Sequence, residues 1–304
     1  MKKLEQILAI SLLPLIWPIS AQAEDALLKV SVTFSILGDL VTAVAGEDAS
    51  VSVLTPAGAE VHEWELIPSN FMALEKADAV FYNGYNLEQW VGQIMATVRE
   101  GVPVVALAKA SGYPTQPIVT GDFAGDPDPH LWMDPRAAAA YAHAIADTLG
   151  EADPDPDAAE RYRARAESLA ESLHALHAEL EDILSTIPDD QRLLITSEAA
   201  FSYFADAYGF EHDGIWGTNS EEEGAPRQLM RIVELVQERQ PDAIFWESTI
   251  SDRHVSGVAR DTNVATAGPL YVDSLSEAGG VAPDYPSMMR HNATLLSDTL
   301  GGPR

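Results

Sequence analysis

The stretch DAAERYRARAESLAESLHALHAELEDILST (157–186) determines how the rest of the chain is organised. It contains no Gly or Pro and is rich in Ala, Leu, Glu and Arg, which favour helix. It therefore predicts one continuous helix of about 45 Å, because each residue adds about 1.5 Å. Turn-forming sequences at 151–157 (EADPDPD) and 187–191 (IPDDQ) delimit it. Such a helix is a rigid strut rather than a flexible linker.

Short apolar runs alternate with helical patterns on both sides of this strut, which is typical of an α/β fold. Asp134-Pro135 is typical of a helix start, with a capping residue followed by Pro at the first helical position. The predicted strands cover 28–34, 51–54, 79–83, 102–107, 193–196, 243–247 and 268–273. The other predicted helices cover 36–46, 69–77, 87–99, 135–149, 198–208, 226–239, 251–260 and 284–299.

The first residues have the pattern of a secretory signal peptide. A basic start, MKK, precedes the short apolar run ILAISLLPLIWPIS and the small-residue site AQA, so we expect cleavage after Ala23. The chain has no cysteine, and hence no thiol for a disulfide, a metal or a lipid anchor. We therefore expect a soluble, unanchored periplasmic protein. Its parts would be the signal peptide (1–23), an N-terminal α/β lobe (24–155), the linking helix (156–187) and a C-terminal α/β lobe (188–304).

The chain is strongly acidic. Removing residues 1–23 takes away Lys2, Lys3 and Glu5, so the formal charge changes from −29 to −30. This charge argues against nucleic acids and anionic membranes as partners, because both carry negative charge themselves. It suits the attraction of cations, although an acidic surface also simply keeps a protein soluble.

Four residues with metal-binding side chains follow predicted strands. His62 lies in GAEVHEWELIPSN (58–70), His130 in GDPDPHLWMDP (125–135), Glu198 follows LLITS, and Asp273 ends GPLYVD. Doubly wound sheets bind ligands at the carboxyl ends of their strands, and divalent metals use imidazole and carboxylate ligands. These four residues are therefore candidate metal ligands.

Each candidate also has a structural interpretation. A single histidine in a loop is commonly held by hydrogen bonds, and Asp273 before Ser274 is compatible with a turn. Glu198 stands at the predicted start of the helix 198–208, where the helix dipole favours a negative charge by about 0.3–1 kcal/mol. Glu247, at the end of another strand, suits either an inner carboxylate of the site or a structural salt bridge. We expect either a role in excluding water from the site or a place in the core for Trp64, Trp132 and Trp216. We expect an exposed position on the strut for His174 and His177.

The chain resembles the solute-binding proteins of bacterial manganese/zinc ABC importers, the adhesin-type metal-binding family. The resemblance covers nearly the whole chain after residue 23 and implies two (βα)4-like lobes, joined by one long rigid helix, with a metal in the cleft between them. It places the ligands at His62, His130, Glu198 and Asp273. The matching stretches are GAEVHEWELIPSN, ADAVFYNGYNLEQWV, DPHLWMDPRAAAAYAHAIADTL, TSEAAFSYFADAYG, IWGTNSEEEGAPRQ, FWESTISDR, YVDSLSEAGG and YPSMMRHN.

The resemblance favours the manganese branch of that family. Its zinc members usually have a third histidine where this chain has Glu198, and many carry a His-rich loop before the second ligand. Here that loop is TGDFAGDPDPH (120–130), which is acidic and whose sole histidine is His130. Two imidazoles with two carboxylates also form a harder donor set, which suits Mn²⁺, although any such site binds Zn²⁺ more tightly.

The expected function is thus periplasmic capture of one divalent metal, Mn²⁺ before Zn²⁺ or Fe²⁺, and its delivery by a monomer to an inner-membrane ABC permease. No reaction would be catalysed. Three alternatives stay open at this point, and the first is a zinc-specific binding protein of the same family. A metallohydrolase would need an open metal position and a general base, and a binder of organic solutes would need stacking aromatic and polar groups in its cleft.

Overall fold

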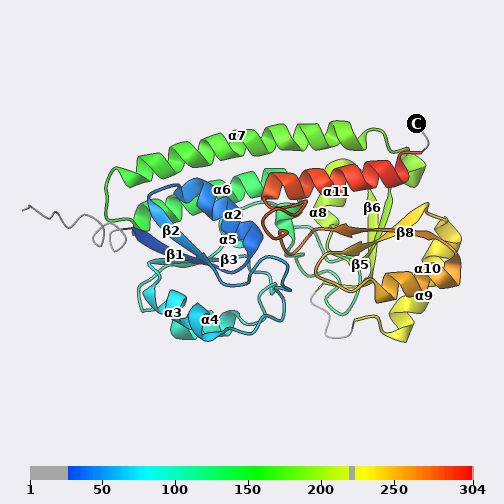
Figure 1. The fold of residues 1–304 in the computed structure, drawn as a ribbon, viewed down its shortest axis with the longest axis horizontal. Helices are drawn as coiled ribbons and strands as arrows, with labels where there is room; N and C mark the ends of the chain where they lie inside the picture. Colours follow the sequence, from blue (N-terminus) through cyan, green and yellow to red (C-terminus); the bar gives the residue numbers. More distant parts are fainter. Residues whose placement is uncertain (1–26, 219–222, 303–304) are drawn as a thin grey trace, which may run out of the picture.

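A computed structural model gives the structure of the protein and describes residues 27–218 and 223–302. The expected signal peptide lies outside the described residues. Two groups of strands and helices lie side by side along the long axis, and helix α7 runs along one edge of both (Figure 1). We call residues 27–152 the N-terminal lobe and residues 193–302 the C-terminal lobe. The predicted two-lobed α/β architecture is confirmed.

Helix α7 (Ala158–Leu184) forms as one continuous element, as its composition predicts. It packs against α2 (Ser35–Ala45) and α6 (Pro135–Ala152) of the N-terminal lobe, and against α11 (Tyr285–Leu300) of the C-terminal lobe. Its buried side chains continue into one apolar core that includes residues of both lobes. The strut therefore packs against helices of both lobes.

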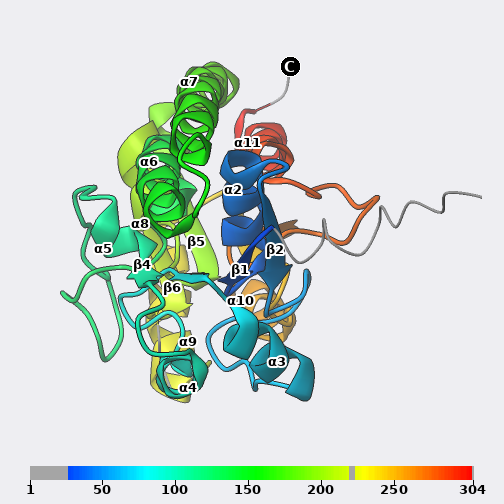
Figure 2. The same ribbon diagram turned by 90° about the vertical axis from the view of Figure 1, so that its left-hand side faces the viewer.

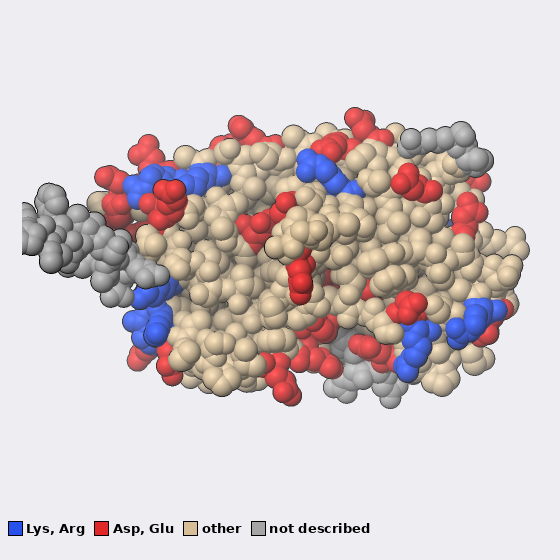
Figure 3. All heavy atoms as spheres, viewed as in Figure 1, with Lys and Arg blue, Asp and Glu red and all other residues tan. Residues whose placement is uncertain are grey.

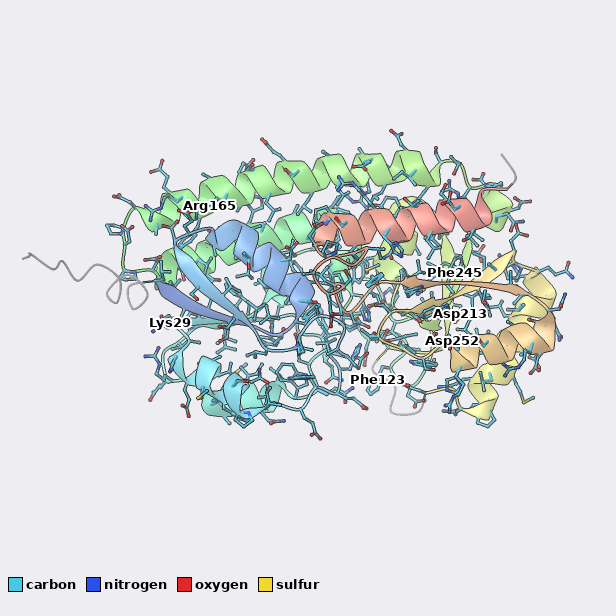
Figure 4. The ribbon with its side chains drawn as sticks, in the orientation of Figure 1. Lys29, Phe123, Arg165, Asp213, Phe245 and Asp252 are labelled. Carbon is cyan, nitrogen blue, oxygen red and sulfur yellow. The ribbon has the colours of Figure 1, made fainter. Side chains whose placement is uncertain are left out.

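Two arginines attach the first turns of α7 to the N-terminal lobe. Asp48, three residues after the end of α2, forms ion pairs with Arg161 and Arg165 of the helix. Arg165 lies above the N-terminal lobe in Figure 4 and also donates to the carbonyl of Ala45, near the end of α2. Helix α7 is thus connected to α2 by polar contacts as well as by packing.

The N-terminal lobe contains a four-stranded parallel sheet in the order β2-β1-β3-β4. Helices α2 and α6 cover the face towards α7, and α3 and α4 lie on the opposite side (Figure 2). Asp134 caps α6 by accepting from Arg136 N–H, and Pro135 is its first residue, as predicted. The bounds are β1 (Leu28–Val32), β2 (Ala49–Val53), β3 (Ala79–Tyr82), β4 (Val104–Ala106), α3 (Pro68–Lys76), α4 (Val91–Thr97), α5 (Leu107–Ala110) and the 3₁₀ turn η1 (Leu131–Met133).

The C-terminal lobe consists of two parallel strand pairs, β5-β6 and β7-β8, with β5 beside β7. Helices α8 and α11 lie on the side of α7, and α9 and α10 lie on the other side (Figure 1). The bounds are β5 (Leu193–Glu198), β6 (Glu211–Trp216), β7 (Ala243–Glu247), β8 (Ala265–Leu270), α8 (Ser202–Tyr208), α9 (Pro226–Arg239), α10 (Arg253–Thr262) and the 3₁₀ turn η2 (Asp189–Gln191).

Several element predictions for the C-terminal lobe and the strut are wrong. Strand β6 is missed, because its first residues, Glu-His-Asp-Gly, have no apolar run and pairing with β5 holds them extended. Strand β8 lies three residues earlier than predicted, so 271–273 has already left the strand. His177 is half-buried rather than exposed, because its Nδ1 lies 3.1 Å from the hydroxyl of Tyr208 in α8.

The surface reflects the acidic composition. Acidic side chains are scattered over the face shown in Figure 3, and the few basic ones lie close to acidic neighbours. Within the described ranges, no helix combines the length and the apolar character that crossing a bilayer requires.

Candidate metal centre

The four candidate ligands come from four separate places in the fold, two in each lobe. His62 lies in the loop between β2 and α3, and His130 directly precedes η1. Glu198 is the last residue of β5, and Asp273 follows β8. All four therefore lie at or beyond the carboxyl ends of parallel strands, where doubly wound sheets place their ligands.

The structure brings these four side chains together. One donor atom from each lies within 4.8 Å of the others. His62 Nε2 is 3.7 Å from Glu198 Oε1, and His130 Nε2 is 3.3 Å from Asp273 Oδ1. Bonds of about 2.0–2.2 Å to a central ion would separate donor atoms by at most about 4.4 Å. That limit applies to ligands on opposite sides of the ion; ligands at tetrahedral positions lie about 3.3–3.6 Å apart, as the 3.3 and 3.7 Å pairs nearly do already, so the remaining donor atoms would close further around one ion.

The carboxylates are buried with unused acceptor capacity. Glu198 is 4 % exposed and Asp273 is 0 % exposed. Glu198 Oε1 and Asp273 Oδ2 accept no hydrogen bond from any residue that the structure describes. Buried carboxylate oxygens without donors are costly, because they have lost their hydration. A cation between the four side chains would satisfy both oxygens.

An acidic residue stands two positions before each histidine and holds that histidine's main chain. Glu60 Oε1 accepts the backbone N–H of His62 at 2.9 Å, and Asp128 Oδ1 accepts that of His130 at 2.9 Å. Asp128 Oδ1 also lies 2.7 Å from His130 Nδ1, which directs Nε2 towards Asp273. A carboxylate on the far nitrogen is the usual way to orient a metal-binding histidine. We did not predict these two residues, although the acid-x-His pattern at 60–62 and 128–130 was readable in the sequence.

The electrostatics show that protons compete for this site. Burial lowers the pKa of His130, but Asp128 and Asp273 outweigh burial and hold this pKa well above its usual value. Burial likewise opposes protonation of His62, and the carboxylates led by Glu198 raise its pKa. Burial raises the pKa of Glu198 to about 7, with the positive charge of His62 opposing the shift. A metal ion would displace these protons, because its ligands bind in their deprotonated forms.

Glu198 is positioned by a strand and not by a helix start. The predicted helix at 198–208 begins only at Ser202, so the helix-dipole account of this carboxylate is wrong. Instead, Glu247 at the end of β7 accepts two backbone N–H groups of β5, from Ser197 at 3.2 Å and from Glu198 at 2.9 Å. Glu247 is fully buried, and its recorded contacts among the described residues are these hydrogen bonds rather than an ion pair. Its carboxyl group, whose pKa burial raises to about 8, therefore joins β7 to the ligand-bearing strand.

Two of the three tryptophans named from the sequence border the site. Trp132 is fully buried, and its ring lies 5.2 Å from that of His130. Trp216 is buried and lines a cavity of about 40 Å³ that also contacts His62 and Glu198. The acidic side chains of Glu60, Glu63 and Glu223 line the same cavity. Trp64 packs instead with an apolar cluster of the N-terminal lobe, so its position supports the core interpretation.

Comparison with known proteins identifies the family. The sequence model described as "ZnuA: Zinc-uptake complex component A periplasmic" matches residues 30–299. The chain belongs to this family of metal-uptake binding proteins. The predicted resemblance to the binding proteins of metal ABC importers is therefore confirmed, and the family gives no support to a hydrolase.

Curated relatives in this family carry the names of several metals. The chain is 39% identical to "Manganese-binding lipoprotein MntA" of Halalkalibacterium halodurans over 87% of this chain and 86% of the relative. It is 37% identical to "Iron-binding protein YfeA" of Yersinia pestis, over 90% and 86%. It is 31% identical to "Manganese ABC transporter substrate-binding lipoprotein PsaA" of Streptococcus mitis, over 90% and 89%.

Solved structures of family relatives match along most of the chain. A manganese-bound periplasmic metal-binding protein of Candidatus Liberibacter asiaticus superimposes with a TM-score of 0.80 and 27% identity. This match covers 89% of this chain and 98% of that one. The periplasmic zinc-binding protein TroA of Treponema pallidum has a TM-score of 0.81, at 26% identity and with the same coverage. The fold is thus shared with binding proteins for different divalent metals.

The expectation of an unanchored protein is wrong on this comparison. It rested on the lack of cysteine and on the leader pattern at 1–23, which lies outside the described residues. Relatives from Halalkalibacterium halodurans and from streptococci are named lipoproteins. Lipoprotein names thus recur among relatives that match most of this chain. The periplasmic description of the family is compatible with an anchored or a free protein.

Proposed function

We propose that this protein captures one divalent transition metal between its lobes and delivers it to an ABC permease. The proposed ligands are His62 and His130 from the N-terminal lobe and Glu198 and Asp273 from the C-terminal lobe. The observation that carries the proposal is the meeting of four buried donor atoms within 4.8 Å. Two carboxylates neutralise a 2+ charge, so the ion would be held in a nearly dry site without leaving an uncompensated charge.

We infer that Mn²⁺ is the favoured cargo, with Zn²⁺ and Fe²⁺ as alternatives. Glu198 and Asp273 give the site two carboxylates, and carboxylates are the harder ligands that suit Mn²⁺. A carboxylate can also bind through both oxygens, which raises the coordination number above four. The relatives named for manganese support this preference. A higher affinity for Zn²⁺ would not contradict it, because a given N/O site binds Zn²⁺ more tightly than Mn²⁺.

We further propose that the protein acts by binding alone, as a monomer. Catalytic metal sites keep a position open for water and place a base beside it. Here all four buried side chains would be used as ligands, and the neighbouring Asp128 and Glu247 accept hydrogen bonds that hold ligand residues. The acidic surface argues against nucleic acid as a partner. The proposed working units are the lobes 24–155 and 188–304, with 156–187 as the strut between them.

Calorimetric titration of the metal-free protein with Mn²⁺ and Zn²⁺ tests the proposal. We expect one ion per chain, and a stabilisation of about 2.7 kcal/mol when the free metal is 100 times its dissociation constant. His130→Ala should abolish tight binding. His143→Ala is the matched control, because His143 is an exposed histidine on α6. Unchanged affinity in His130→Ala, or no binding by the unaltered protein, would contradict the proposal.

A further inference from the structure

The segment that carries Asp273 is hydrogen-bonded to the N-terminal lobe on both sides of that residue. On one side, Trp132 Nε1 donates to the carbonyl of Val272 at 2.7 Å. On the other side, the backbone N–H of Gly58 donates to Ser274 Oγ at 2.7 Å. These bonds join parts of the chain that are 140 and 216 residues apart in sequence. They cross from one lobe to the other immediately next to a proposed ligand.

A second serine completes the connection beyond Asp273. Ser35, the first residue of α2, has its Oγ 3.2 Å from Ser274 Oγ and accepts the backbone N–H of Leu275 at 2.9 Å. Ser274 in turn donates to the carbonyl of Leu275 at 3.1 Å. Ser274 Oγ thus accepts hydrogen bonds from the N–H of Gly58 and the hydroxyl of Ser35, and it donates its own proton to the carbonyl of Leu275. These three bonds use the full hydrogen-bonding capacity of the Ser274 hydroxyl. We call Ser35, Gly58, Ser274 and Leu275 the serine clasp.

The clasp and the Trp132–Val272 bond together connect Asp273 with the loops of both proposed histidine ligands. Gly58 belongs to the loop that carries His62, and Trp132 lies two residues after His130. Asp273 projects from between the two bonded residues, Val272 and Ser274. Its distance to the histidines is therefore set by hydrogen bonds to their own loops, and not only by the packing of the C-terminal lobe.

We propose that Ser274 is a positioning residue that holds Asp273 against the two histidines and slows the release of the bound metal. This inference rests on the ligand set proposed above. An ion held by two ligands from each lobe leaves when one lobe gives up its ligands. Moving Asp273 away from the histidines requires breaking the Gly58 and Ser35 bonds to Ser274, so these bonds oppose the same motion as the metal does.

The hydroxyl of Ser274 has no role as a ligand in this scheme. Its Oγ is directed to Gly58, Ser35 and Leu275, and Ser274 is 1 % exposed. Ser274→Ala should therefore leave the donor set complete and change mainly the rate at which the ion leaves. We expect the dissociation rate of Mn²⁺ to rise about tenfold, because the free energy of about one hydrogen bond between the lobes is lost. The association rate should stay unchanged.

Stopped-flow capture of released Mn²⁺ by excess chelator measures this rate, with the melting temperature of the metal-free protein recorded in parallel. Ser276→Ala is the matched control, because the Ser276 hydroxyl bonds only to Glu277 and Ala282 of its own loop among the described residues. Ser274→Thr retains the hydroxyl and should restore slow release. Ser35→Ala should also speed release, and the double variant should change the rate less than the product of the two single effects, because both act in one network.

The outcomes separate this inference from the proposed function. If the unaltered protein and Ser276→Ala bind no metal, the proposed function fails. If both bind metal and Ser274→Ala releases it at the unaltered rate, the proposed role of Ser274 in slowing release is refuted and the proposed function stands. A purely structural hydroxyl would lower the melting temperature of the metal-free protein in Ser274→Ala and leave the release rate of the folded protein unchanged, and that result also refutes the clasp.

Discussion

Replacing Glu247 by alanine should destabilise the protein far more than a change at one side chain usually does. Glu247 is fully buried and accepts the N–H groups of Ser197 and Glu198. Alanine would leave both groups buried without an acceptor, at about 1–3 kcal/mol each. We therefore expect a loss of about 2–6 kcal/mol, against a typical total of about 5–15 kcal/mol. Glu247→Gln keeps one acceptor oxygen, so it should lose about half as much.

Urea denaturation of the metal-free protein measures these differences without contributions from metal binding. The midpoint should fall in the order unaltered, Gln, Ala, with an unchanged dependence on urea concentration. Glu234→Ala, an exposed glutamate on α9, should stay within about 0.5 kcal/mol. If Glu247→Ala lies within about 1 kcal/mol of the unaltered protein, the carboxylate is not what secures β5. The account of how Glu198 is positioned would then be wrong.

Three further predictions follow from the site and the strut. Binding of Mn²⁺ should weaken about tenfold per pH unit below pH 7 for each proton that the metal displaces. The reason is that Glu198, with a pKa of about 7, binds metal only when it is deprotonated. Titrations with Mn²⁺ at several pH values measure this slope. Glu198→His should raise the preference for Zn²⁺ over Mn²⁺ in competition titrations, and an unchanged preference would remove Glu198 as the reason for favouring manganese. Asp48→Asn should cost about 1–2 kcal/mol at neutral pH after allowing for solvent screening, because Arg161 and Arg165 lower the pKa of Asp48 from 3.8 to about 2. That contribution is complete above pH 3.8 and is lost as the pH falls through about 2, so denaturation curves of the two proteins should converge there.

Several features were predictable because their causes are local. The strut forms where about seven turns of helix-favouring residues run without Gly or Pro, and Asp134-Pro135 starts α6 by a cap and a preset backbone angle. Buried parallel strands appear as short apolar runs, which located β1, β3, β5 and β7. The candidate ligands were found by searching just after such runs, since parallel strands bring their carboxyl ends to one edge.

Other features were hidden because their causes lie far away in the sequence. Strand β6 has a polar first half, and only its pairing with β5 keeps it extended. Glu198 was assigned to a helix start from its neighbours, yet Glu247, 49 residues further on, accepts its N–H. The 216-residue separation between Gly58 and Ser274 makes their bond invisible to any local pattern.

The sequence by itself determined the α/β class, the strut and the residue types of the candidate site, because composition and periodicity act between neighbours. Only the tertiary structure decided that His62, His130, Glu198 and Asp273 meet within 4.8 Å. It also decided which groups hold them: Asp128 behind His130, Glu247 behind Glu198, and the serine clasp beside Asp273. The physical reason is that these hydrogen bonds form only after the packing of both lobes under α7 has brought distant loops together.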